Sequence, residues 1–106
     1  DREMELIVTI PAAGGETEIG VARYTINPDG QSCEFAVVVA DNWQRKGIGS
    51  RLLTELIECI RDKGIKLIEG WVLKQNTGML QLVKALGFDI TASPDDSKLM
   101  YVSKTL

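Results

Sequence analysis

The stretch Trp-Gln-Arg-Lys-Gly-Ile-Gly-Ser at residues 43–50 decides how this chain folds. An apolar run typical of a β-strand, Phe35 to Ala40, precedes it, and an amphipathic helix is predicted from Arg51 to Lys63 after it. Gly47 and Gly49 allow the backbone to turn tightly and to approach a ligand closely. The unpaired amides at the start of the helix, with the positive end of its dipole behind them, indicate a site for a phosphate or pyrophosphate.

Two common phosphate-binding loops do not fit this stretch. A P-loop requires a lysine after its last glycine, and none follows Gly49 directly. The dinucleotide fingerprint requires a third glycine three residues after the second, where this chain has Leu52. The pattern that remains is Gln-x-x-Gly-x-Gly, formed by Gln44, Gly47 and Gly49. The alternative is a glycine-rich turn that only joins a strand to a helix.

The pattern resembles the pyrophosphate loop of the GNAT superfamily of N-acyltransferases, whose members bind acyl-coenzyme A. A second similarity follows at the family's spacing, where Asn76 precedes an apolar run that ends in Leu-Gly-Phe at residues 86–88. Two shorter runs, Glu-Phe-Ala-Val-Val-Val at 34–39 and Asn-x-x-Met-Leu at 76–80, are similar to the GNAT domain of bacterial Pat-type protein lysine acetyltransferases. In that group the domain often lies at the C-terminal end of a chain with an acyl-CoA-synthetase-like region.

Composition narrows the class of protein. The 106 residues suffice for one domain, and no apolar run approaches the length of a membrane span, so no membrane partner is expected. A net charge of −3 argues against nucleic acid as the main ligand. Two cysteines and no histidine exclude the usual zinc sites and Ser-His or Cys-His catalysis within this chain, so we expect no metal and a cytoplasmic location. Because the sequence begins at Asp1 rather than Met, we expect an excised domain or a processed product. The Pat-type resemblance implies that residues 1–106 are a single GNAT-like domain from the C-terminal part of a longer chain.

Alternation and turn residues divide the chain into six strands and two helices. The strands are predicted at residues 5–10, 18–26, 33–40, 66–73, 88–91 and 98–103, and the helices at 51–63 and 77–86. This is an α+β layout, and the resemblance implies α/β/α layers around a mixed, mostly antiparallel sheet with a parallel strand pair at the acyl-CoA cleft. Relative to the family, the first strand and the first two helices are missing. Three consecutive valines at 37–39 predict a strand that is buried on both faces.

The resemblance implies a coenzyme site along these segments. Backbone amides from about Arg45 to Ser50 would hold the pyrophosphate, with help from the side chains of Gln44, Arg45 or Lys46, and the pantetheine arm would pair with the third strand. Asn76 would bind near the thioester, although an asparagine at this position is equally typical of a helix N-cap. The full set implied for acetyl-CoA is Val37, Val39, Gln44, Arg45, Lys46, Gly47, Ile48, Gly49, Ser50 and Asn76.

Glu34 is the predicted general base. An acceptor amine of the lysine type has a pKa of about 10.4 and must lose a proton before it attacks. Glu34 stands ten residues before Gln44, where similar GNAT lysine acetyltransferases carry a glutamate. The alternatives are that Glu34 is only an exposed residue at a strand end, and that Glu69 is the base. An acyl-cysteine route through Cys33 is conceivable, but no histidine is available to activate the thiol.

Taken with the resemblance, these features predict an enzyme that transfers the acetyl group of acetyl-CoA directly to a primary amine in a ternary complex. The resemblance favours a protein lysine as the acceptor, and it implies a synthetase-like region in the same full-length chain. An unrelated nucleotide-binding protein is one alternative, and two others remain open. One is a small-molecule amine as the acceptor, and the other is a regulatory module that senses coenzyme A without turnover.

Overall fold

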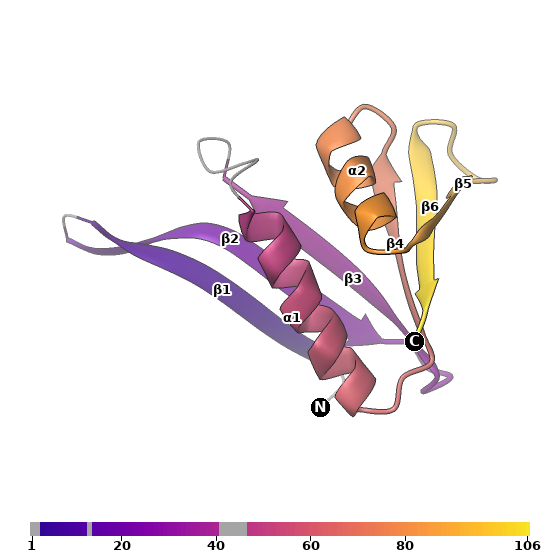
Figure 1. Ribbon diagram of the computed structural model, residues 1–106, viewed down its shortest axis with the longest axis horizontal. Coiled ribbons are helices and arrows are strands. Elements are labelled where there is room, and N and C mark those ends of the chain that lie inside the picture. Colours follow the sequence, from indigo (N-terminus) through magenta and orange to yellow (C-terminus); the bar gives the residue numbers. More distant parts are fainter. Residues whose placement is uncertain (1–2, 13, 41–46) are drawn as a thin grey trace.

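A computed structural model of the chain describes residues 3–12, 14–40 and 47–106. Within them, six strands and two helices follow in the predicted order (Figure 1): β1 (Glu3–Ala12), β2 (Gly15–Ile26), β3 (Ser32–Val39), α1 (Ile48–Asp62), β4 (Leu67–Leu73), α2 (Thr77–Ala85), β5 (Asp89–Ala92) and β6 (Leu99–Thr105). Every predicted element is present. The bounds shift by a few residues, and α1 begins at Ile48, inside the glycine stretch, rather than at Arg51. Neither of these two helices is long and apolar enough to cross a membrane.

The strands form one sheet in the order β1-β2-β3-β4-β6-β5. All neighbouring strands are antiparallel except β3 and β4. Parallel pairing joins only residues 32–34 of β3 to residues 67–69 of β4, and beyond these pairs the two strands diverge, as Figure 1 shows. The predicted α+β fold, with a mixed, mostly antiparallel sheet and one parallel pair, is confirmed.

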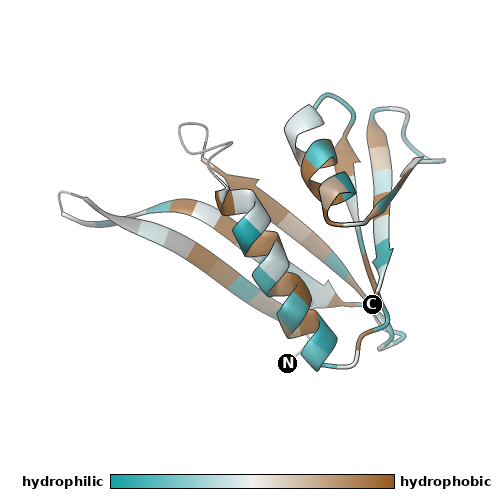
Figure 2. Cartoon of the chain, in the orientation of Figure 1, coloured by the Kyte–Doolittle hydropathy of each residue, from teal (hydrophilic) through white to brown (hydrophobic). Residues whose placement is uncertain are grey.

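Both helices cover the same face of the sheet. Toward β2 and β3, α1 buries a stripe with the spacing of one helix face, formed by Leu52, Leu53, Leu56, Ile57 and Ile60. In the same core α2 buries Val83, and the ring of Phe88 packs against Phe35 of β3 at a centroid distance of 5.5 Å. The hydrophilic residues of α1 lie on the side turned away from the sheet (Figure 2). In the part of the chain that the structure describes, the implied α/β/α arrangement is therefore reduced to two layers.

The helix-free face of the sheet carries exposed apolar side chains. The prediction that the valines at 37–39 are buried on both faces is wrong, because Val38 is 67% exposed on this face while Val37 and Val39 are half-buried beneath the helices. Burial on both faces needs a cover on both, and the two helices lie on one side. Among the side chains that the structure describes, Ile7, Trp71 and Leu73 are the other large apolar ones exposed on the helix-free face.

A close contact fills the point where β3 and β4 diverge, which we call the fork. Gly70 follows the last parallel pair, and a Cβ built on it would lie 2.7 Å from the ring of Phe35. Phe35 is buried and packs against Phe88, so its ring has little room to move. The lack of a side chain at Gly70 therefore lets an aromatic ring occupy the fork.

Gly70→Ala is expected to lower the free energy of unfolding by about 1–3 kcal/mol, because the new methyl group overpacks against the Phe35 ring. Urea unfolding followed by circular dichroism measures the change. Gly78→Ala in α2 is the control, since no atom lies within 4 Å of a Cβ at that position, and it is expected to raise stability by up to about 1 kcal/mol. Equal stability of Gly70→Ala and the native chain would contradict this packing.

Candidate active site

A hollow of about 520 Å³ is bounded by the C-terminal half of β3 and by the starts of α1 and α2. We refer to it as the helix-side hollow. It is lined by Val37, Val38, Val39, Gly47, Gly49, Ser50, Gln75, Asn76, Thr77, Gly78, Met79 and Leu82. Three segments that are distant in the sequence meet in it. They bring together six of the residues predicted to bind the coenzyme, namely Val37, Val39, Gly47, Gly49, Ser50 and Asn76.

The start of α1 is shaped by two glycines. Gly47 is the N-cap residue and has a φ of 84°, a left-handed conformation that favours glycine, and it has no side chain of its own with which to cap the helix. A Cβ at Gly49 would lie 3.3 Å from Leu82 of α2, so the two helices approach closely at this end. The first turn of α1 carries no acidic side chain. Its backbone amides, at the positive end of the helix dipole, therefore stand at the edge of the hollow where an anion is favoured.

The backbone of β3 also offers hydrogen-bonding groups to this space. The amide of Ala40 donates to the carbonyl of Ile19 in β2 at 2.9 Å. Because N–H groups alternate in direction along a strand, that of Val37 points away from β2, toward the space that opens between β3 and β4. An extended ligand in the helix-side hollow can therefore pair with β3 as an added strand does.

Asn76 caps α2, which confirms one of its two predicted roles, because its Oδ1 accepts a hydrogen bond from the amide of Met79 at 3.2 Å. Its Nδ2 group has no hydrogen-bond partner among the residues that the structure describes, so it is available to a ligand. The side chain of Ile48 points toward Gly20 of β2, and only the backbone of Ile48 can serve the hollow. Three further predicted coenzyme residues lie outside the described residues: Gln44, Arg45 and Lys46.

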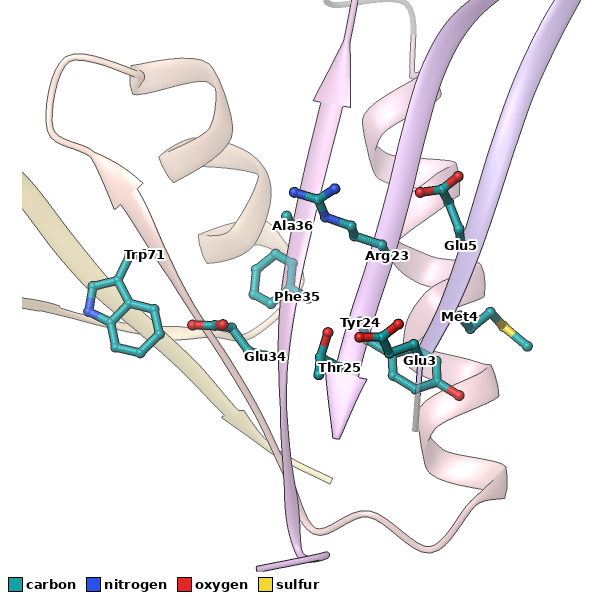
Figure 3. A pocket seen from close by; sticks show the side chains of 10 residues that line it. All are labelled: Glu3, Met4, Glu5, Arg23, Tyr24, Thr25, Glu34, Phe35, Ala36 and Trp71. Carbon is teal, nitrogen blue, oxygen red and sulfur yellow. The ribbon is translucent and has the colours of Figure 1, made fainter. Parts of the chain in front are cut away.

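A second hollow, of about 680 Å³, lies on the helix-free face and contains Glu34. Figure 3 shows the Glu34 carboxylate extending from β3 toward β4, on the side where Trp71 lies. Glu34 is exposed, and its carboxylate has no hydrogen bond or ion pair within residues 3–12, 14–40 and 47–106. This open-face hollow is lined by Glu3, Met4, Glu5, Arg23, Tyr24, Thr25, Glu34, Phe35, Ala36 and Trp71.

The fork lies between the two hollows. Glu34 is in the last parallel pair before it, while Val37 and Val39 follow on the opposite face of the same strand. A ligand that enters along the helix-side hollow therefore meets Glu34 only at the fork, where the strands no longer pair. This arrangement suits a reaction in which a long donor is held on one face and a second reactant approaches a carboxylate from the other.

Residues 2–88 of the chain match the Acetyltransferase (GNAT) family. The chain belongs to this family. It is 31% identical over 96 residues to acetyltransferase PA5475 of Pseudomonas aeruginosa, a match that covers 91% of this chain and 52% of that protein.

Two solved structures share the fold of this GNAT domain. The GNAT domain of S. lividans PAT is 25% identical with a TM-score of 0.82, and the match covers 99% of this chain and 61% of that one. The Campylobacter jejuni N-acetyltransferase PseH in complex with acetyl coenzyme A is 27% identical with a TM-score of 0.68, covering 84% of this chain and 60% of that one. The chain therefore spans between 52% and 61% of the length of these three relatives.

Glu69 of the GNAT domain, the second candidate for the base, is engaged by two hydrogen bonds. The hydroxyl of Tyr101 donates to Glu69 Oε1 at 2.6 Å, and Nδ2 of Asn27 donates to Oε2 at 2.9 Å. The bond to Glu69, with a smaller contribution from burial, raises the pKa of Tyr101 above its usual value. Glu34, the neighbour of Glu69 in the parallel pair, is the carboxylate left open to a reactant. No sequence signal marks this network, because its bonds join residues 32 and 42 positions apart.

Cys33 is a poor nucleophile in this GNAT domain. Its side chain is fully buried, and burial, with the charge of Glu69 in second place, raises the pKa of the thiol to about 12. The thiolate is the reactive form, and almost none of it forms near neutral pH. Direct transfer is therefore favoured over an acyl-cysteine route. The described part of the chain holds no cluster of three or more side chains suited to bind a metal ion.

Alkylation is expected to separate the two cysteines. At a pH of about 8, iodoacetamide should modify the half-buried Cys59 and leave Cys33 largely unmodified in the folded protein. Because the pKa of Cys33 is raised, its thiolate accumulates only as the pH rises toward about 12, and the protection should persist in moderately alkaline buffer. Mass spectrometry of the peptides measures the ratio, and protein unfolded in urea, in which both thiols react, is the control. Equal labelling in the folded protein would contradict the prediction.

Proposed function

We propose that this GNAT domain catalyses the acetyl-CoA-dependent N-acetylation of a primary amine, with the side chain of a protein lysine as the acceptor. The observation that carries the proposal is the helix-side hollow, where three separate segments bring six predicted coenzyme residues together. Family membership supports acetyl transfer. The similar protein PseH has been solved in complex with acetyl coenzyme A, which supports this donor. The Pat-type pattern at residues 34–39 and 76–80, together with the likeness to S. lividans PAT, supports the lysine acceptor.

In the proposed complex the coenzyme lies in the helix-side hollow. Its pyrophosphate accepts hydrogen bonds from the amides between Gly47 and Ser50, at the start of α1, with side-chain help from residues 44–46. The pantetheine arm runs along β3 near Val37 and Val39, and Nδ2 of Asn76 donates to it. This path delivers the acetyl group to the fork, next to the carboxylate on the other face.

The proposed reaction is a direct attack within a ternary complex. The acceptor arrives as an ammonium ion, since a lysine amine has a pKa of about 10.4, and Glu34 takes one proton from it directly or through water. The amine nitrogen then forms a bond to the thioester carbonyl carbon, and the amide near Val37 stabilises the oxyanion. The carbon–sulfur bond breaks, and coenzyme A leaves as a thiolate. The nitrogen loses its second proton as the amide forms, and solvent carries a proton to the thiolate sulfur.

The proposal extends to the setting of the domain. We propose that the enzyme acts in the cytoplasm and that its full-length chain carries a synthetase-like region, as the Pat-type resemblance implies. The support is the 25% identity to the GNAT domain of S. lividans PAT, of whose chain the match covers 61%.

Ser50→Glu tests the coenzyme site. Ser50 lines the helix-side hollow in the first turn of α1, so a carboxylate there repels the pyrophosphate. The same carboxylate interacts favourably with the positive end of the helix dipole, so the fold is preserved. Isothermal titration with acetyl-CoA is expected to show binding at least about tenfold weaker than that of the native chain. Gln31→Glu, which adds the same charge at an exposed position before β3, is the control. Native-like binding by Ser50→Glu, or no binding by the native chain, would count against the site.

Glu34→Gln tests the base. Because the amide cannot take a proton, kcat for acetylation of a lysine peptide is expected to fall by about 10²–10⁴-fold, with the affinity for acetyl-CoA nearly unchanged. Glu18→Gln removes an exposed carboxylate of β2 outside both hollows and is the matched control. Undiminished turnover in Glu34→Gln would refute its role. Tight coenzyme binding by the native chain without turnover of any amine would indicate a module that senses coenzyme A.

A further inference from the structure

Trp71 occupies an unusual place for a large aromatic residue. Its side chain is 45% exposed on the helix-free face of β4, and it lines the open-face hollow toward which Glu34 extends (Figure 3). An indole kept half in solvent at the wall of a hollow presents a large rigid contact surface to a ligand. Leu73, two residues further along the same face, is exposed to a similar extent but does not line the hollow.

The indole is supported from behind by Tyr101. The two residues stand opposite one another on β4 and β6, and their rings meet edge to face at a centroid distance of 5.4 Å. Tyr101 is itself fixed, because its hydroxyl donates to Glu69, whose other oxygen accepts from Asn27. Asn27 also donates to Oγ of Ser32 at 2.8 Å. The aromatic wall of the hollow therefore rests on a hydrogen-bonded support that joins β4, β6 and the start of β3.

The open-face hollow combines this wall with an excess of negative charge. Of its lining residues, Glu3, Glu5 and Glu34 are anionic and Arg23 is cationic. Carboxylates attract an ammonium ion, and an indole face packs against methylene groups and also attracts cations. A long aliphatic amine satisfies both features, because its stem covers the indole while its ammonium reaches Glu34. A short amine meets only the charge.

We propose that Trp71 determines the acceptor specificity of the open-face hollow by packing against the methylene stem of a long primary amine. Tyr101, fixed by Glu69, is the positioning residue that orients the indole. This inference rests on the proposed acetyltransferase function and adds to it the residue that selects the acceptor by the length of its stem, with a preference for a primary ammonium at the end of about four methylene groups.

Binding can be measured without turnover. The chain has two tryptophans, so in a Trp43→Phe background the fluorescence comes from Trp71 and reports contact with it directly. Coenzyme A replaces acetyl-CoA, and the probes are methylamine, propylamine, pentylamine and Nα-acetyl-lysine methylamide. The affinity is expected to rise with the length of the stem, by about tenfold or more from methylamine to pentylamine.

Acetylation of the same amines tests the specificity. Trp71→Ala is expected to lower kcat/KM for the long amines by about tenfold, mainly through KM, and to leave methylamine unaffected. Trp71→Phe should retain part of the preference. Tyr101→Phe should give a smaller loss with the same dependence on length, a pattern that general damage to the fold does not produce. Leu73→Ala is the matched control and should keep the native ratio between long and short amines.

The outcomes separate the two proposals. An affinity that does not depend on stem length, or a Trp71→Ala variant that slows all amines equally, would overturn the role of Trp71 and leave the acetyltransferase proposal standing. Binding that depends on stem length, without turnover of any amine, would support the role of Trp71 and overturn the proposed activity.

Discussion

The divergence of β3 and β4 is the constraint on which the rest of the structure depends. Parallel pairing stops at Glu34 and Glu69, and the ring of Phe35 occupies the fork that follows. If the pairing continued, the outward backbone groups of β3 would bond to β4, and none would face the helix-side hollow. The divergence thus leaves the outward amide of Val37 unpaired with β4, while the Glu34 carboxylate extends from the same strand on the helix-free face.

The electrostatics of the two hollows follow from where each draws its charge. The chain has a net charge of −3, yet the helix-side hollow favours an anion. Among the described residues, the positive potential there comes from backbone amides at the start of α1 rather than from side chains. The open-face hollow draws its charge from three carboxylates. In the proposed complex, an anionic donor and a cationic acceptor are thereby attracted to opposite faces, and the sheet between them keeps the donor phosphates away from Glu34.

Much of this arrangement could be predicted from the sequence, because its signals are local. Three signals determine backbone structure only within a few residues: the glycines at 47 and 49, the cap at Asn76 and the alternation along each strand. Each led to the element or contact observed. The family resemblance implied the parallel pair, and the single helix that joins β3 to β4 is the usual connection for such a pair.

What could not be predicted depends on contacts between distant segments. The exposure of Val38 depends on which face the helices cover, and a run of three valines carries no information about that. The choice between Glu34 and Glu69 depends on Tyr101 and Asn27, which reach Glu69 from other strands and turns. Trp71 could be assigned to a strand from its sequence, but its place at the wall of a hollow requires the register between β4 and β6.

The parallel pair has a consequence for the order in which the molecule folds. The β1–β2 and β2–β3 hairpins join partners that are close in sequence, whereas pairing β3 with β4 closes a loop that contains the whole of α1. Loop closure of this kind costs more entropy and slows folding. The helix-side hollow is lined by segments on both sides of that loop, so it is expected to form late. A ligand bound there would act as a clasp, holding the C-terminal half of the chain against the hairpins that formed before it.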